Sequence, residues 1–148
     1  MRKIYIGADS AGFTLKEEVK EHLISLDYTV EDMGCDSTAS CHYPEFAGKV
    51  CMKVQENLDD SFGILICGTG IGMSMCANKY KGIRAALCSD TFSARMTRCH
   101  NDANLLCMGA RVIGSCLAMD IVDSFLGAEF EGGRHAVRVE MMMEIENK

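Results

Sequence analysis

The sequence predicts an α/β fold: a Rossmann-like, doubly wound sheet of five parallel strands flanked by helices, with a C-terminal helix. Short β-like runs alternate along the chain with longer segments whose apolar residues recur at helical spacing. Each alternation has the length of a βαβ unit, which joins parallel strands and covers both faces of the sheet. Because 148 residues with 48% hydrophobic content support one core, we expect a single domain over residues 1–148.

The first half of the chain contains three predicted strands and two predicted helices. Residues 3–7 form the first strand, and Leu15, Val19 and Leu23 then recur at helical spacing up to residue 26. Residues 29–33 form the second strand. Pro44 stands where a helix start tolerates proline, and an apolar residue follows about every four positions up to residue 58. The third strand covers residues 62–67.

The second half repeats the alternation and ends in an additional helix. We expect helices over residues 71–79 and 91–100, and strands over residues 85–88 and 105–109. A fifth helix is marked by Leu117, Ile121, Val122 and Phe125. Two glycines at 132 and 133 then break the chain before a sixth helix over residues 134–146.

Charge and composition exclude several classes of function. The net charge is −6, and no run of Lys and Arg forms a basic patch despite it. This disfavours nucleic acid as a partner and favours a small molecule. No apolar run approaches the roughly 18 residues of a membrane span. Since the first three residues lead directly into a strand without a secretory segment, we expect a cytoplasmic protein without a membrane partner.

Nine cysteines raise the question of disulfides or metal binding, and their spacing argues against both. The number is odd, no CxxC pair exists, and most lie in apolar segments, where a free thiol behaves as a small buried hydrophobe. We therefore expect reduced, structural thiols, with Cys67 as the exception. The cysteines are at positions 35, 41, 51, 67, 76, 88, 99, 107 and 116.

The most informative segment is residues 64–72, in which an apolar strand ends in Cys67 and opens into alternating glycines. In an open α/β sheet the ligand crevice lies beyond the carboxyl ends of the strands, and a helix start there offers free N–H groups. A thiol in that position is easily held as the reactive thiolate. We therefore predict an active-site loop around Cys67.

Known phosphate and nucleotide motifs do not fit the glycines of this chain. In the loop after Cys67 the third glycine comes one residue too early for a dinucleotide fingerprint. The Gly7 to Gly12 segment lacks the lysine of a P-loop, because Phe13 and Thr14 follow it. The loop from Gly68 to Met73 contains no basic residue that could cradle phosphate beside Cys67, which disfavours a thiol phosphatase. We expect neither a nucleotide cofactor nor a metal.

Two arginines near the C-terminus, Arg134 and Arg138, are neighbours on one helix face. Cations at a helix N-terminus oppose the helix dipole and repel each other. A phosphate bound between them would remove this conflict. Compensation by Glu131, Glu140 or solvent is the alternative.

A series of ordered motifs extends over essentially the full chain: Gly7-Ala-Asp9 with Gly12, Tyr43-Pro44, Cys67-Gly-Thr-Gly-Ile-Gly72, Asn78-Lys79, Gly82-Ile-Arg84, His100-Asn-Asp with Asn104, Gly109-Ala-Arg111 and Glu131-Gly-Gly-Arg-His135. Together they resemble the ribose-5-phosphate isomerase B family of ribose/galactose phosphate isomerases. The resemblance implies an aldose-ketose isomerase of the pentose phosphate pathway. Such an enzyme interconverts ribose 5-phosphate and ribulose 5-phosphate through an enediolate without a metal or cofactor.

The resemblance also implies catalytic roles. Cys67 would move the proton between C2 and C1 of the open-chain sugar, and His100 would open the sugar ring. Thr69 would assist at the sugar oxygens. The backbone N–H groups of Gly68, Gly70, Ile71 and Gly72 would stabilise the enediolate oxygen. From the residues alone, a loop cap remains the alternative for Thr69 and a helix-terminal cap the alternative for His100.

The resemblance assigns further residues to substrate binding. Asp9, Ser10 and Tyr43 would contact the substrate, with a turn or helix cap as the alternative for Asp9. Asn101 would act from a partner subunit, so the resemblance implies a homodimer, or a tetramer, with shared active sites. The phosphate would be held by forked guanidinium groups; these belong to Arg111, Arg134 and Arg138.

One residue departs from the family pattern. After the first strand the family usually has Asp-His, where this chain has Asp9 followed by Ser10. Serine keeps a hydrogen-bond donor but loses a charge that would help to bind phosphate. A six-carbon substrate, such as allose or galactose 6-phosphate, therefore stays an alternative, and a non-catalytic phosphosugar-binding module is a second one.

Overall fold

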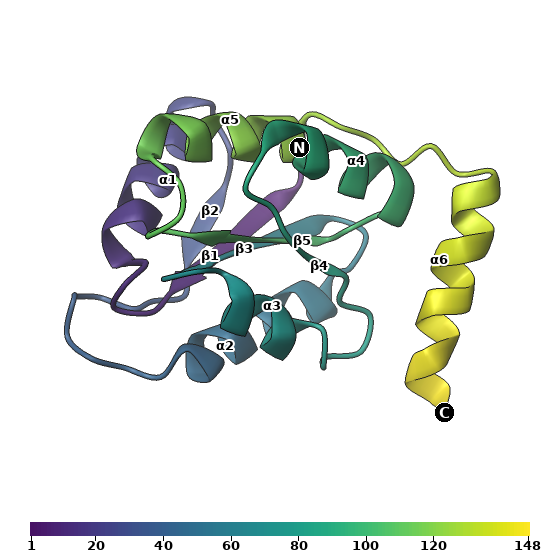
Figure 1. Ribbon diagram of the computed structural model, residues 1–148, viewed down its shortest axis with the longest axis horizontal. Coiled ribbons are helices and arrows are strands. Elements are labelled where there is room, and N and C mark those ends of the chain that lie inside the picture. The colour runs from purple at the N-terminus through teal and green to yellow at the C-terminus, as the bar shows by residue number, and fades with distance from the viewer.

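The computed structural model describes residues 1–148 and has one parallel five-stranded sheet between two layers of helices (Figure 1). The strand order is β2-β1-β3-β5-β4. From β1 the chain adds β2 on one side, and from β3 it passes to the edge strand β4 on the other side before β5 returns to pair with both β3 and β4. The switch between β1 and β3 is where a doubly wound sheet opens a crevice at its carboxyl edge. The predicted fold class is confirmed. The strands are β1 (Lys3–Ala8), β2 (Val30–Asp32), β3 (Ser61–Cys67), β4 (Ala85–Leu87) and β5 (Leu105–Gly109).

Three helices cover one face of the sheet: α1 (Phe13–Ser25), α4 (Thr91–Asn101) and α5 (Ser115–Leu126). Most of their predicted apolar positions, among them Leu23, Ile121 and Phe125, are fully buried in this layer, whereas Leu117 near the start of α5 is 38% exposed. Phe125 packs edge-on against Phe62 of β3, with ring centroids 5.5 Å apart. The helical spacing seen in the sequence thus corresponds to the faces that pack on the sheet.

Two helices cover the opposite face: α2 (Tyr43–Glu56) and α3 (Ile71–Ala77). The central strand β3 is buried at all seven of its positions because helices lie on both sides of it. Successive side chains of a strand point to opposite faces, so Ile64 and Ile66 belong to the first layer while Leu65 and Cys67 belong to the second. Cys67 therefore ends β3 beneath α2 and α3.

The last helix, α6 (Arg134–Glu144), lies outside these layers, packs chiefly against α4, and is followed by a 3₁₀ turn over Ile145–Asn147 (Figure 1). His135 is its only buried residue. A groove of about 800 Å³ separates its later part from the body of the protein, and the backbone N–H of Gly82 donates across it to the Glu146 carboxylate at 3.0 Å. More than half of the surface of Val137 and Met141 is exposed.

The predicted elements all occur, with shifts at their ends. The second strand has three residues in place of the predicted residues 29–33, because it is an edge strand that pairs with β1 alone. The second helix ends at Glu56, where Asn57 leaves helical geometry, and not at residue 58. The final helix tightens into a 3₁₀ turn after Glu144. None of the helices has the length and apolar character needed to cross a membrane.

Candidate active site

The thiol of Cys67 lies at the carboxyl end of the central strand and is largely buried, with 5% of the residue exposed. Its Sγ accepts a hydrogen bond from the backbone N–H of Gly70 at 3.1 Å. A donor aimed at sulfur stabilises the thiolate over the thiol. The loop after β3 thus supplies a partner for the reactive form of Cys67.

The other cysteines differ from Cys67 in their surroundings. All nine are free, as the sequence predicts. Burial raises the pKa of Cys51 to about 12 and that of Cys88 to about 11. Burial likewise raises the pKa of Cys107 well above its usual value. These three thiols stay neutral at neutral pH, which fits a structural role.

The glycines of the loop allow it to fit between the ends of β3 and β5. Gly70 has φ +78°, and a Cβ there would lie 2.4 Å from Leu87 Cδ1 and 2.9 Å from the Met108 carbonyl carbon. A Cβ on Gly109 would lie 2.6 Å from the backbone of Thr69. Glycine is therefore required at 70 by both conformation and space.

Several N–H groups of this loop have no partner within the chain, namely those of Gly68, Thr69 and Gly72. The N–H of Ile71 donates to the Thr69 hydroxyl oxygen at 3.2 Å. Thr69 thus caps the loop, which was the alternative role considered for it from the sequence. Its exposed hydroxyl still has a hydrogen to donate. Converging free N–H groups can stabilise a negatively charged oxygen.

The loop after β1 lies against the same edge of the sheet. Asp9 donates its N–H to the Ile66 carbonyl at 3.2 Å, and Ser10 follows it, half-buried. One carboxylate oxygen of Asp9 accepts from the Gly12 N–H at 3.0 Å, as the turn-cap alternative predicts. The other oxygen makes no hydrogen bond within the chain and can accept from a sugar hydroxyl.

Tyr43 and Arg111 complete this side. The Tyr43 ring lies over Gly72, since a Cβ on that glycine would be 2.7 Å from the ring. Arg111 donates its N–H to the Gly68 carbonyl at 2.9 Å, and its guanidinium lies over the same glycine. We call this group the thiol cluster, which contains Asp9, Ser10, Tyr43, Cys67, Gly68, Thr69, Gly70, Ile71, Gly72 and Arg111.

The remaining predicted site residues lie at the opposite edge of the sheet. Helix α4 runs back from the carboxyl end of β4 to the amino end of β5, so His100 and Asn101 on its last turn lie near the amino edge. Arg134 and Arg138 belong to α6, which packs on α4. A single chain therefore does not bring these four residues to the thiol cluster.

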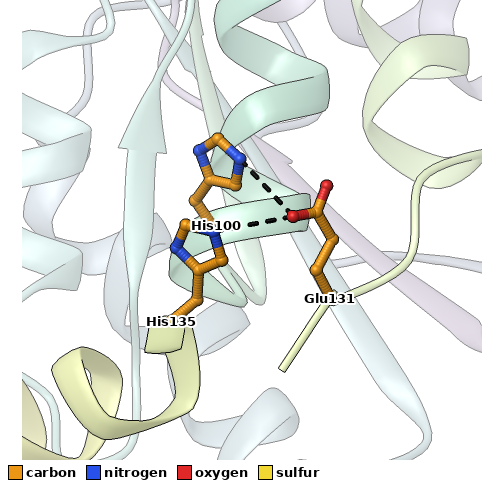
Figure 2. A group of neighbouring side chains, drawn as sticks. All are labelled: His100, Glu131 and His135. Atoms are coloured by element: carbon orange, nitrogen blue, oxygen red, sulfur yellow. Dashed lines mark ion pairs between the residues drawn. The ribbon is translucent and has the colours of Figure 1, made fainter. Parts of the chain in front are cut away.

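His100 belongs to a second group, the histidine cluster, which consists of His100, Glu131 and His135 (Figure 2). The two imidazole rings stack with centroids 4.2 Å apart and 11° between their planes. Glu131 Oε2 lies 3.7 Å from His100 Nε2 and 3.5 Å from His135 Nε2. Burial lowers the pKa of His135, and the neighbouring charges of His100 and Arg134 lower it further.

The three side chains of this cluster offer ligand atoms within 4.8 Å of one another, a spacing that could hold a metal ion. The nearly parallel rings argue against it, because lone pairs in parallel ring planes do not converge on one point. The geometry suits the handling of protons better than metal coordination.

An arginine clamp, formed by Arg84 and Arg98, holds the turn that carries His100, and neither residue was predicted to belong to the site. Asp102, with φ 47°, ends α4 in the left-handed region. Arg84 Nε donates to the carbonyl oxygens of Asn101 at 3.1 Å and Asp102 at 2.9 Å. Arg98 donates to the Asp102 carboxylate at 2.8 Å. The i,i+4 spacing of Arg98 and Asp102 in the sequence could have indicated this ion pair.

Arg134 and Arg138 are exposed and form no ion pair. Glu131 faces the two histidines, and Glu140 forms no ion pair either. Acidic neighbours therefore do not compensate these arginines, which leaves solvent or a bound anion as their counterpart.

Comparison with known proteins gives consistent matches over the whole chain. The profile of the Ribose/Galactose Isomerase family matches residues 4–142. Ribose-5-phosphate isomerase B of Escherichia coli is 48% identical, covering 100% of this chain and 99% of its own. The D-erythrulose-4-phosphate isomerase of Pectobacterium atrosepticum is 45% identical, covering 95% and 92%.

A solved structure agrees with the fold as well. The crystal structure of ribose-5-phosphate isomerase B from Mycoplasma genitalium with bound ribulose-5-phosphate has a TM-score of 0.96 and 43% identity. The alignment covers 99% of this chain and 97% of the other. With the family profile spanning nearly every element of the sheet and its helices, the chain belongs to the ribose/galactose isomerase family.

Proposed function

We propose that residues 1–148 form one sugar-phosphate isomerase domain that interconverts D-ribose 5-phosphate and D-ribulose 5-phosphate. The observation that carries this proposal is the Cys67 thiol, which ends the central strand within a loop of unpartnered N–H groups. The relatives named as ribose-5-phosphate isomerase B and the one with bound ribulose-5-phosphate support the same substrate. Nine free cysteines fit a reducing compartment, which supports a cytoplasmic location.

The reaction begins with ring opening, because only the open-chain aldose has a carbonyl to isomerise. His100 accepts the proton of the C1 hydroxyl and supplies one to the ring oxygen O4 as the C1–O4 bond breaks. The products of this step are a C1 aldehyde and a C4 hydroxyl. An imidazole suits both transfers because one ring nitrogen can accept a proton while the other carries one to donate.

Proton transfer follows at the thiol cluster. The Cys67 thiolate removes the C2 proton, and the electron pair moves to form the enediolate with its charge on the C1 oxygen. The N–H groups of Gly68 and Gly72 stabilise this charge, a contribution of about 3 to 4 kcal/mol for one well-placed donor. The same thiol then returns the proton to C1 while the proton of the C2 hydroxyl passes to the C1 oxygen, which leaves a C2 ketone and a C1 hydroxyl and regenerates the thiolate. Thr69 donates a hydrogen bond to a sugar oxygen during this transfer.

The site requires a second copy of the chain. His100 and Asn101 lie at the amino edge of the sheet while Cys67 lies at the carboxyl edge, and the exposed apolar residues of α6 offer a contact surface. We therefore infer a homodimer, or a tetramer built from it, in which His100 and Asn101 of one copy complete the thiol cluster of the other.

Three arginines supply the phosphate site in this arrangement. Arg111 lies beside Gly68, and Arg134 and Arg138 project from α6 without acidic partners. Guanidinium groups bind a phosphate dianion bidentately. Asp9, Ser10 and Tyr43 then face the sugar hydroxyls. Ser10 provides a neutral donor in this site, so the arginines carry more of the phosphate binding.

A second candidate substrate comes from the Pectobacterium relative, which is named for D-erythrulose 4-phosphate. A four-carbon aldose phosphate cannot close a furanose ring, so it requires proton transfer without ring opening. A panel of four-, five- and six-carbon aldose phosphates, compared by kcat/KM, separates these possibilities. The highest value with ribose 5-phosphate is expected.

The decisive experiment follows ribose 5-phosphate conversion in the presence of EDTA for the natural protein, Cys67→Ala and Cys116→Ala. Cys116 is exposed on α5 and does not belong to the thiol cluster, which makes it a matched control. We expect turnover in the natural protein and in Cys116→Ala, and its loss in Cys67→Ala. Turnover by Cys67→Ala would refute the thiol as the base.

Mixing two inactive variants tests the shared site. If Cys67 and His100 act from different copies, heterodimers of Cys67→Ala and His100→Gln contain one intact site. Random pairing of equal amounts gives half heterodimers, so about a quarter of the natural activity is expected. No recovery after unfolding and refolding the mixture would show that both residues act from one chain.

A further inference from the structure

The imidazole of His100 makes no hydrogen bond within the chain, although its proposed role requires a fixed orientation. A group that transfers protons must lie within hydrogen-bond reach of its target and be held there by its neighbours. With 38% of its side chain exposed, His100 has little packing on its solvent side. Its orientation must therefore come from the remaining contacts, which are those of the histidine cluster.

His135 provides a fixed plane beside the His100 ring. Only 9% of its side chain is exposed, and its backbone N–H donates to the Gly132 carbonyl at 3.1 Å in the first turn of α6. The rings stack with their centroids 4.2 Å apart, slightly closer than the roughly 4.5 to 7 Å usual for aromatic pairs. Rotation of His100 away from this plane would lose the stacking, so His135 restricts the plane of the His100 ring.

Glu131 acts on the edge of the same ring (Figure 2). Its backbone N–H donates to the Cys99 carbonyl at 3.0 Å, which attaches it to the residue before His100. Its Oε2 lies beside the stacked rings, 3.7 Å from His100 Nε2 and 3.5 Å from His135 Nε2, and the His135 Nε2 is buried without a hydrogen-bond partner. A carboxylate beside one imidazole nitrogen favours the proton on that nitrogen and leaves the other for the substrate.

We propose that His135 and Glu131 are positioning residues that hold the His100 imidazole, by stacking and by attraction at Nε2, in the orientation that opens the sugar ring. This inference rests on the proposed function, since it assumes that His100 opens the ring of ribose 5-phosphate. It assigns neither residue a contact with the substrate. The pair acts through His100 alone, so it affects ring opening and leaves proton transfer at Cys67 unchanged.

Two measurements separate these steps. Conversion of ribose 5-phosphate requires ring opening, whereas exchange of the C1 proton of ribulose 5-phosphate with deuterium oxide requires only the enediolate step. Ribulose 5-phosphate cannot close a furanose ring because its C5 oxygen carries the phosphate. The variants are Glu131→Gln, His135→Phe and His135→Ala, with Glu140→Gln as a control on α6 that has no ion pair.

We expect Glu131→Gln and His135→Ala to convert ribose 5-phosphate about tenfold more slowly, a part of the 100- to 10,000-fold that a positioned acid–base group contributes. Their deuterium exchange stays within about twofold of the natural protein, as does Glu140→Gln in both measurements. His135→Phe keeps the stacking plane and should recover most of the activity lost in His135→Ala.

Equal losses of conversion and exchange in Glu131→Gln would overturn the proposal, because a general structural defect affects both steps. Unchanged conversion in Glu131→Gln would overturn the role of the carboxylate. Glu131 is more than half exposed, so this variant is expected to fold even if His135→Ala does not. Failure of the proposed function looks different, since the natural protein itself would then neither convert ribose 5-phosphate nor exchange ribulose 5-phosphate.

Discussion

Substitution of Gly70 by alanine tests whether the glycine loop is shaped for catalysis. Two costs follow from the structure. The φ of +78° places an alanine in the left-handed region, at about 1 to 2 kcal/mol. The new Cβ would meet Leu87 Cδ1 at 2.4 Å and the Met108 carbonyl carbon at 2.9 Å, so backbone must move, at about 1 to 3 kcal/mol more. The sum is about 2 to 5 kcal/mol of unfolding free energy.

Activity should fall further than stability alone would explain. The Gly70 N–H donates to Cys67 Sγ, and the adjacent N–H groups are those assigned to the enediolate. Displacing a preorganised donor by about 1 Å typically costs on the order of 100-fold in rate. We therefore expect kcat of Gly70→Ala to fall about 100-fold at a temperature where the variant is fully folded.

Gly132→Ala is the matched control for stability. Gly132 has φ +68°, and nothing lies within 4 Å of the position of its Cβ. Only the conformational cost of about 1 to 2 kcal/mol applies there. Urea unfolding followed by circular dichroism measures both variants, because the chain has no tryptophan. Equal destabilisation of the two variants would refute the packing argument, and unchanged kcat in Gly70→Ala would refute the role of the loop.

Three further predictions concern other parts of the molecule. Burial opposes ionisation of Asp32, but hydrogen bonds from the buried Lys16 and from Lys20 outweigh it and lower the pKa of Asp32. The ionised carboxylate therefore stabilises the fold above about pH 4, and this stabilisation is lost as the pH falls through the pKa of Asp32 in the folded protein. Asp32→Asn should therefore lose about 2 to 3 kcal/mol at pH 7 and show a shallower decline below pH 4 in urea unfolding; an unchanged pH profile would contradict this. Arg84→Met removes the hydrogen bonds to the end of α4 and should cost about 2 to 4 kcal/mol, with ribose 5-phosphate conversion falling more than ribulose 5-phosphate exchange; equal falls would contradict the positioning role. Arg138→Gln should raise KM for ribose 5-phosphate and Ki for inorganic phosphate about tenfold each, which corresponds to a loss of about 1.4 kcal/mol of binding free energy. Unchanged values would place the phosphate elsewhere.

The fold could be predicted from the sequence because the apolar residues that form the core follow patterns set by near neighbours along the chain. Apolar positions such as Val19 and Phe125 repeat at helical spacing, and the buried run that ends at Cys67 marks the central strand. The edge strand was less well predicted, since its ends depend on pairing with one neighbour. Helix ends such as Asn57 depend on backbone geometry that no periodicity records.

The thiol cluster could be predicted in part for the same reason. Cys67 and the glycines are contiguous in sequence, so the loop was evident without tertiary information. The packing of Tyr43 on Gly72 and of Arg111 on Gly68 joins segments distant in sequence, and only the motifs of the family indicated it. The stack of His100 on His135 was not predicted, because it depends on where α6 returns to the body.

The separation of the thiol and histidine clusters follows from the topology itself. In a βαβ unit the helix runs antiparallel to the strands, so its last turn always lies at the amino edge of the sheet. The five residues of β5 span about 17 Å, farther than an imidazole can reach. A fold of this kind cannot bring the end of α4 to the end of β3 within one chain. If one active site uses both Cys67 and His100, the second copy is a chemical requirement of the reaction, and variants that weaken the association of copies should lose conversion of ribose 5-phosphate before they lose the fold.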